Sequence, residues 1–133
     1  MKRVELAWSG EGLEFAGGMP GVPGINMDGN AKTGPSPMNL LLLSLASCSA
    51  IDIVHILERM RQPLERLTME VEADREEGEG ARKWTSIHMR FFITGDIPQA
   101  KAQRAIDLSV EKYCSAYKQL KDSAEISTEL VLN

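Results

Sequence analysis

The chain is poor in the residue types that hold metals or cross-link small domains. Its 133 residues include two cysteines and two histidines. A structural zinc site takes about four such ligands, so we expect no metal. A single pair of thiols also excludes a disulfide-rich scaffold. In a reducing compartment, two thiols are more often free or catalytic than a structural cross-link.

Positive charge and long apolar runs are also lacking. The 15 lysines and arginines are outnumbered by 19 acidic residues, for a net charge of −4. Nucleic-acid-binding domains carry a basic patch, so no nucleic-acid partner is expected. The longest uninterrupted apolar run is residues 40–43, and no apolar stretch follows Lys2 and Arg3. We therefore expect neither a membrane span nor a signal peptide, and a cytoplasmic location.

The hydrophobic pattern predicts one α+β domain over residues 1–133. Apolar and polar residues alternate in several short stretches, as in strands with one covered face. Gly- and Pro-rich residues 17–36 and charged residues 75–83 are expected to be loops. The expected element order is β-β-β-α-β-β-α-β. Its strands lie in a hairpin over residues 1–17, around residues 22–27, and at residues 67–74, 85–94 and 125–132.

Two helices are predicted between these strands. Ser36 suits an N-cap and Pro37 the first helical position, and Pro63 would end this helix at about residue 62. Residues 38–50 are apolar nearly all round, so we expect them to be buried on all sides by a sheet or by a partner subunit. The second helix is expected to span residues 98–115, with Ser109 among its inward-facing residues.

The two thiols lie on these separate helices. Cys48 is in the apolar half of the first helix, and Cys114 is at the end of the second. Each alone would suit a buried structural thiol. Together they are either two inert thiols or a nucleophile with a resolving partner. In the second case a thiolate reduces a peroxide and becomes a sulfenic acid, the other thiol closes a disulfide, and an external dithiol reopens it.

An attacking thiol needs a lowered pKa, which a nearby cation supplies. Cys48 lies about three turns into its helix, where the helix dipole has little effect. Asp52 and His55 follow on the same helical face. Asp52 alone would raise the thiol pKa, and His55 is two turns away, so we interpret both as a polar seam at the edge of the core. His88 is expected to be solvent-exposed on the polar face of a strand.

The motif residues resemble a known family. Residues 34–41, Gly-Pro-Ser-Pro-Met-Asn-Leu-Leu, and 45–50, Leu-Ala-Ser-Cys-Ser-Ala, resemble the first-helix signature of the OsmC/Ohr family of osmotically induced proteins and organic hydroperoxide reductases. Residues 111–115 resemble its second-cysteine segment. The resemblance implies an intertwined homodimer with sites at the subunit interface. It also implies a peroxidatic Cys48, a resolving Cys114, organic or lipid-like hydroperoxides as substrates, an external dithiol as reductant and no cofactor.

The chain departs from the reductase pattern and looks like the YhfA-like branch of the family. Met38 stands where the reductases carry a Glu, and no arginine lies between Arg3 and Arg59 to pair with it. Ser115 replaces a proline that often follows the second cysteine. An alternative function is therefore binding or sensing of a small lipophilic ligand on the same dimer. The cations that could replace the missing arginine, supplied by the partner subunit, are Lys32, Arg59, Arg61 and Arg90.

Overall fold

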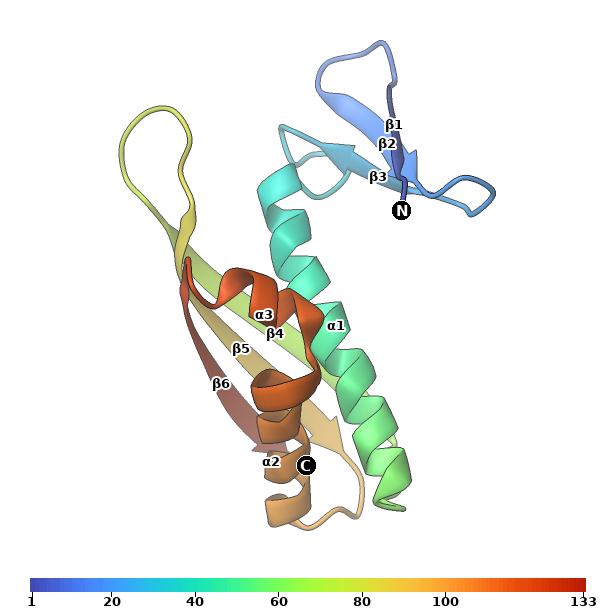
Figure 1. Ribbon diagram of the computed structural model, residues 1–133, viewed down its shortest axis with the longest axis vertical. Coiled ribbons are helices and arrows are strands. Elements are labelled where there is room, and N and C mark those ends of the chain that lie inside the picture. The colour runs from blue at the N-terminus through green and yellow to red at the C-terminus, as the bar shows by residue number, and fades with distance from the viewer. The chain divides into compact units, whose positions relative to one another are not determined.

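A computed structural model describes all residues, 1–133 (Figure 1). It divides the chain into two compact units, Met1–Leu42 and Leu43–Asn133. A long helix, α1 (Pro37–Arg59), begins in the first unit and continues through the second. The α+β class and the predicted order of strands and long helices are confirmed.

The first unit contains an antiparallel sheet of order β1-β2-β3. The strands are β1 (Glu5–Trp8), β2 (Glu14–Gly18) and β3 (Ile25–Asp28), so the predicted hairpin and third strand are confirmed. The register pairs Trp8 with Phe15 and Phe15 with Met27. Because side chains alternate across a strand, one face of this sheet is apolar. Two of its members, Leu6 and Trp8, are 63% and 60% exposed.

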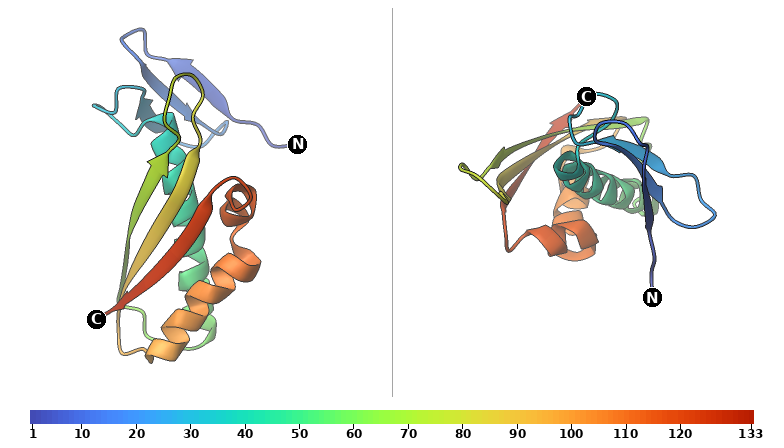
Figure 2. Two further views of the ribbon diagram at one scale, coloured as in Figure 1. Left: turned by 90° about the vertical axis from the view of Figure 1, so that its left-hand side faces the viewer. Right: turned by 90° about the horizontal axis from the view of Figure 1, so that it is seen from above.

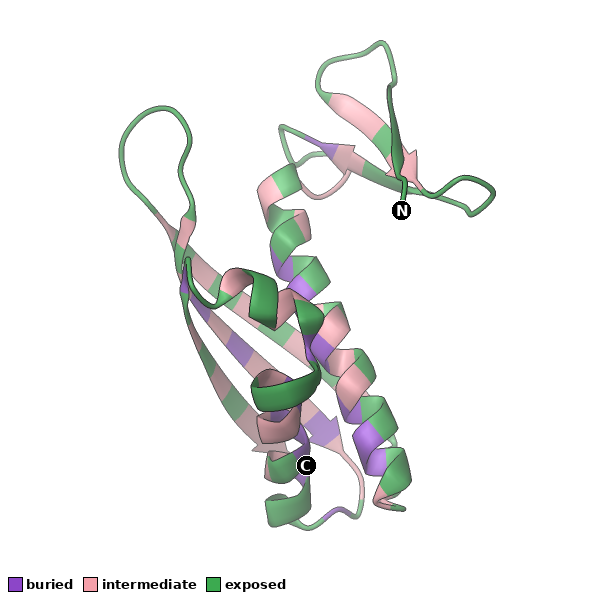
Figure 3. Cartoon of the chain, in the orientation of Figure 1, coloured by how far each residue is buried: buried purple, intermediate pink, exposed green.

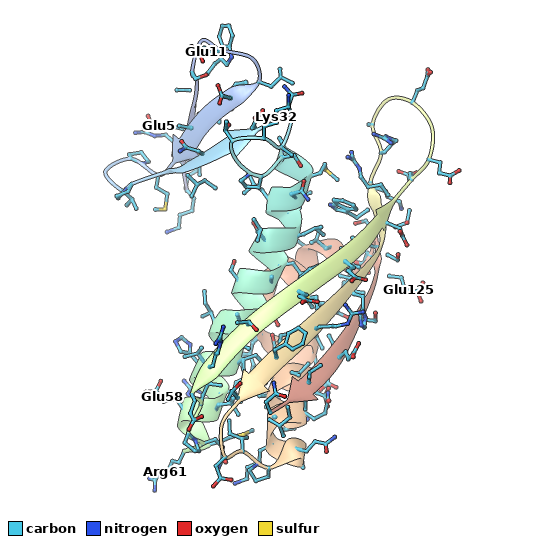
Figure 4. The ribbon with its side chains drawn as sticks, turned by 180° about the vertical axis from the view of Figure 1, so that it is seen from behind. Glu5, Glu11, Lys32, Glu58, Arg61 and Glu125 are labelled. Carbon is cyan, nitrogen blue, oxygen red and sulfur yellow. The ribbon has the colours of Figure 1, made fainter.

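A buried carboxylate organises the loop that leads into α1. Asp28 accepts hydrogen bonds from the backbone N–H groups of Asn30 at 2.9 Å, Thr33 at 3.1 Å and Lys32 at 3.2 Å. These bonds, led by the one from Asn30, hold the pKa of Asp28 below its usual value. The carboxylate thus gathers the N–H groups of a segment that forms no regular structure. Figure 4 labels Lys32 in this loop.

The predicted start of α1 is confirmed, and its end comes three residues early. Ser36 Oγ accepts the N–H of Asn39 at 3.2 Å, which is an N-cap hydrogen bond. At the other end Arg61 adopts a left-handed conformation with φ 56°. The Gln62 N–H then bonds the carbonyl of Leu57 at 2.9 Å, which closes a Schellman motif. This cap ends the helix before Pro63 can do so.

The second unit contains a mixed sheet of order β4-β5-β6. Strand β4 (Arg66–Arg75) pairs antiparallel with β5 (Trp84–Thr94), and β6 (Glu125–Leu132) pairs parallel with β5. A parallel pair requires a crossover, and here helices supply it. In both views of Figure 2, α1 and α2 (Gln99–Leu108) lie on the same side of this sheet.

The core lies between the sheet and these helices. Figure 3 marks buried residues along β5 and on α1 and α2. The opposite face of the sheet is polar, as its alternation predicts. The fully buried apolar residues are Leu45, Ile53, Leu57, Met89, Phe91, Ile93, Ala102, Ala105 and Ile106.

The prediction that residues 38–50 are buried on all sides is wrong for the single chain. Only one side of α1 meets the sheet, and Leu41 and Leu43 are 41% and 53% exposed. The helix is also more apolar as a whole than its short uninterrupted runs indicate. Its 23 residues meet the length and composition expected of a membrane-crossing helix, with a mean hydropathy of 2.1 over its most apolar part. Core helices of soluble proteins meet the same criteria.

The second predicted helix is interrupted. Helix α2 ends at Leu108, and a π-helical turn, η1 (Ser109–Tyr113), follows it. Cys114 is extended, with φ −74° and ψ 107°, and a short helix, α3 (Ser115–Leu120), starts after it. The single helix expected over residues 98–115 is therefore corrected to three successive pieces.

Candidate functional site

The two thiols meet in the second unit. Cys48 lies on α1 and Cys114 lies between η1 and α3, and both are free. Cys114 is 4% exposed, whereas Cys48 is only half-buried. Burial is the main reason that the pKa of Cys114 rises to about 11. Hydrogen bonding to the Cys48 thiol and the negative charge of Asp52 raise this pKa further.

Cys114 is held by its backbone as well as by its side chain. Its N–H donates to the carbonyl of Ser109 at 2.7 Å, the bond that closes the π-helical turn. Its Sγ accepts the N–H of Tyr117 at 3.3 Å, so it acts as the N-cap of α3. The Tyr117 bond favours the thiolate, but its effect on the pKa of Cys114 is smaller than that of burial. The thiol therefore stays protonated at neutral pH.

A buried polar chain beside the thiols joins α1 to η1. The hydroxyls of Ser49 and Ser109, both fully buried, are 2.8 Å apart. Ser109 Oγ donates to Asp52 Oδ2 at 2.9 Å. The roles of Ser49 and Ser109 were not predicted from the sequence. Their signal was a serine in an apolar helix and another in an inward-facing stripe, where a hydroxyl needs a partner.

A pocket of about 320 Å³ adjoins these hydrogen-bonded residues and is lined mainly by α1. Asp52 lines it but turns its carboxylate to Ser109, so the predicted polar seam is corrected at that position. His55 is exposed and makes no hydrogen bond, as the seam predicts. Arg59 is also exposed and forms no ion pair. The other lining residues are Ile56, Met60, Leu108 and Tyr113.

His88 and Arg90 lie on the opposite face of the sheet from the thiols. His88 Nε2 is 2.8 Å from Glu129 Oε1, and its Nδ1 is 2.7 Å from Ser127 Oγ. His88 is therefore paired as well as partly exposed, which corrects the expectation of simple solvent exposure. Arg90 donates to Glu72 at 3.0 Å and to Glu129 at 3.2 Å.

The positions of the other candidate cations follow from the elements that carry them. Since β5 directs Arg90 away from the helices, Arg90 does not serve the thiols of its own chain. Arg61 lies just beyond the end of α1 and is labelled in Figure 4. The same view shows the polar face of the sheet, where Glu125 marks the start of β6. Lys32 belongs to the first unit.

Comparisons with known proteins agree with the fold. A family model described as OsmC-like protein matches residues 29–129. Protein YhfA of Escherichia coli strain K12 is 40% identical over 119 residues, 88% of this chain and 88% of that protein. A hypothetical protein from Aquifex aeolicus VF5 superposes with a TM-score of 0.84 at 30% identity, covering 100% of this chain and 98% of that one.

A more distant match shares the fold. It is a Legionella pneumophila protein described as an organic hydroperoxide resistance protein and redox protein. Its TM-score is 0.71 at 15% identity, with 98% of this chain and 96% of that chain covered. Relatives with this fold are thus described as redox or hydroperoxide-resistance proteins. The extent of the family match and the identity to YhfA show that the chain belongs to the OsmC-like protein family.

Proposed function

We propose that the protein is a thiol peroxidase that reduces organic hydroperoxides in oxidative-stress defence. One observation carries this proposal: two reduced thiols from different helical segments are neighbours, and the Cys48 thiol contributes to the raised pKa of Cys114. A pair of inert thiols has no need for this arrangement. A peroxidatic thiol does, because a second thiol must reach its sulfenic acid before further oxidation.

The surroundings of the two sulfurs support different roles for them. Cys48 is the more exposed sulfur, so a peroxide reaches it first. Its thiolate attacks the outer peroxide oxygen, the O–O bond breaks, and the alkoxide leaves as an alcohol after taking a proton. Cys114 stays protonated because burial raises its pKa, and the neighbouring Cys48 thiol raises it further. Cys48 is then peroxidatic and Cys114 resolving.

The cycle closes with an external dithiol. A thiolate of that reductant attacks the Cys48–Cys114 disulfide, and its second thiol completes the exchange, which leaves both cysteines reduced and the reductant oxidised. No step requires a bound metal or organic cofactor. The proposal places this cycle in the cytoplasm, where thiol reductants are available.

We also propose that the protein works as a homodimer. The exposed side of α1 carries a groove of about 610 Å³ in the second unit. Exposed apolar surfaces of this kind mark interaction sites, and a second copy of α1 would cover this one. The groove is lined by Leu43, Ala46, Ser47, Ala50, Ile51, Val54, His55, Leu67 and Met69.

The same groove supports a second candidate function, binding or sensing of a small lipophilic ligand. Its lining is mostly apolar, and a ligand there would touch the face of α1 next to that of Cys48. Native mass spectrometry of the purified protein tests this alternative. A protein free of ligand that cycles peroxide efficiently contradicts it.

Rapid mixing of the reduced protein with cumene hydroperoxide tests the peroxidase. We expect loss of both thiols and a Cys48–Cys114 disulfide in peptide mass spectra. Cys48→Ser should abolish peroxide consumption. Cys114→Ser should still react once and then accumulate oxidised Cys48. The proposal fails if Cys48→Ser consumes peroxide as fast as the wild type.

A further inference from the structure

The hydroxyl of Ser109 connects the helix that carries Cys48 to the turn that carries Cys114. On one side it contacts Ser49 Oγ at 2.8 Å, and on the other it donates to Asp52 Oδ2 at 2.9 Å. Ser49 follows Cys48 directly in α1, and Asp52 lies one helical turn further along. The hydroxyl is thus fixed relative to the helical turn that bears the more exposed thiol.

The backbone of Ser109 completes the connection. Its carbonyl accepts the N–H of Cys114 at 2.7 Å and closes the π-helical turn. One residue is therefore bound through its side chain to α1 and through its main chain to Cys114. Ser49 and Ser109 are fully buried, and their hydroxyls bond only each other and the Asp52 carboxylate. Since a buried hydroxyl without a partner is costly, these three side chains have one favoured arrangement.

We propose that Ser109, held by Ser49 and Asp52, is a positioning residue that keeps Cys114 in line with Cys48 for disulfide closure. This inference deepens the proposed function and rests on it for the physiological oxidant. Ser109 does not touch the reacting atoms in this arrangement. It acts through the backbone of Cys114.

The step that Ser109 serves is the condensation of the sulfenic acid with the second thiol. The Cys114 sulfur attacks the Cys48 sulfur, the S–O bond breaks, and the S–S bond forms. The hydroxide leaves as water after taking the proton of the Cys114 thiol. The attack requires the two sulfurs to be aligned, and a displacement of about 1 Å can slow such a step by about 100-fold. A delayed closure exposes the sulfenic acid to further oxidation to sulfinic acid.

The test compares four variants of the full-length protein. Ser109→Ala removes the hydroxyl, and Ser109→Thr keeps it. Ser49→Ala removes only one of the two hydrogen bonds. Ser44→Ala is the matched control, because Ser44 is an exposed residue of the same helix one turn before Cys48, and its hydroxyl makes no hydrogen bond. Thermal unfolding establishes which variants are folded.

Each variant is oxidised with cumene hydroperoxide and, separately, with diamide. Diamide accepts two electrons and two protons from a thiol pair and needs no peroxide chemistry. Dimedone trapping measures the Cys48 sulfenic acid, and alkylation followed by mass spectrometry measures the disulfide. The diamide arm keeps a failure of this inference distinct from a failure of the peroxidase proposal.

In Ser109→Ala we expect sulfenic acid to form at the wild-type rate but to close to the disulfide about tenfold or more slowly, with sulfinic acid accumulating. Diamide should show the same slow closure. Ser49→Ala should show a smaller slowing, while Ser109→Thr and Ser44→Ala should close at rates near that of the wild type. Wild-type closure rates with diamide in folded Ser109→Ala overturn the inference. If Ser109→Ala does not fold, wild-type closure in Ser49→Ala overturns it instead.

Discussion

Each unit of the chain contains a three-stranded sheet with one apolar face, but only the second sheet is covered within the chain. In the second unit, Met89 and Phe91 of β5 lie fully buried against helices. In the first unit, the equivalent residues Leu6 and Trp8 are mostly exposed. A sheet needs another layer to bury its apolar face. The difference indicates that the second unit contributes most of the stability of the monomer. The apolar face of the first unit is free to pack against a further surface.

Removing one aromatic side chain from each sheet gives the largest expected contrast. Phe91→Ala leaves a cavity in the core and should lower the free energy of unfolding by about 3–5 kcal/mol. Phe15→Ala, on the uncovered sheet, should cost less in dilute protein. Urea unfolding followed by circular dichroism measures both. Equal losses at every protein concentration would contradict the comparison, whereas a Phe15→Ala effect that grows with concentration would point to cover by a second copy.

The first unit depends on a polar centre rather than an apolar one, and Asp28→Ala should expose this. Since the folded-state pKa of Asp28 is lowered, its stabilising contribution is present above the unfolded-state value of 3.8 and is lost as pH falls below it. We expect faster amide exchange of residues 30–33 in the variant at pH 7. In the wild type the same loss of protection should appear only in acid. Asp96→Ala is the control, and similar exchange in all three proteins would contradict the assignment.

Cover by helices also changes the chemistry of the second unit, because it makes Cys114 a weak acid. Replacing Asp52 by Asn removes a negative charge that raises the pKa of Cys114, so this pKa should fall below its value of about 11. The pH dependence of iodoacetamide labelling at Cys114, read by peptide mass spectrometry, measures the shift. Asp122→Asn, an exposed site after α3, should leave the profile unchanged. An unchanged profile in Asp52→Asn would show that the charge of Asp52 does not contribute to the raised pKa of Cys114.

The uncovered face of the second sheet should behave like a solvated surface, with the smallest effect of all. Hydrogen bonding to His88 is the main cause of the lowered pKa of Glu129, and Arg90 adds to it. Glu129→Gln should therefore weaken the fold slightly above pH 4 and less in stronger acid, where the wild-type carboxylate is also protonated. The difference should shrink in about 1 M salt, which screens exposed charges. A salt-independent loss would mean that this face is covered.

Local signals in the sequence predict much of this fold. Alternating residues such as Thr85 to Ile93 predict β5, and Ser36 with Pro37 predicts the start of α1, since strand periodicity and capping depend on neighbouring residues. The thiol pair was predicted through the resemblance of its motifs, and the structure places the two sulfurs together.

Other features depend on contacts between distant segments, which no local pattern records. The early end of α1 requires a left-handed Arg61, although that conformation favours glycine. The interruption before Cys114 coincides with the hydrogen bonds from Ser109 to α1. The exposed side of α1 could not be predicted, because an apolar pattern indicates that a helix face will be buried. It does not indicate whether the same chain or another molecule buries that face.

The π-helical turn before Cys114 can be regarded as a one-residue insertion in a helix. An α-helical turn in its place would advance each following residue by about 100° around the axis and let α2 continue. Deleting one residue within Ser109–Tyr113 would then rotate the thiol away from α1 without altering either cysteine or the core. In such a chain both sulfurs would still be present, but they could no longer reach each other. The spacing of the backbone, as much as the identity of its side chains, therefore encodes the thiol pair.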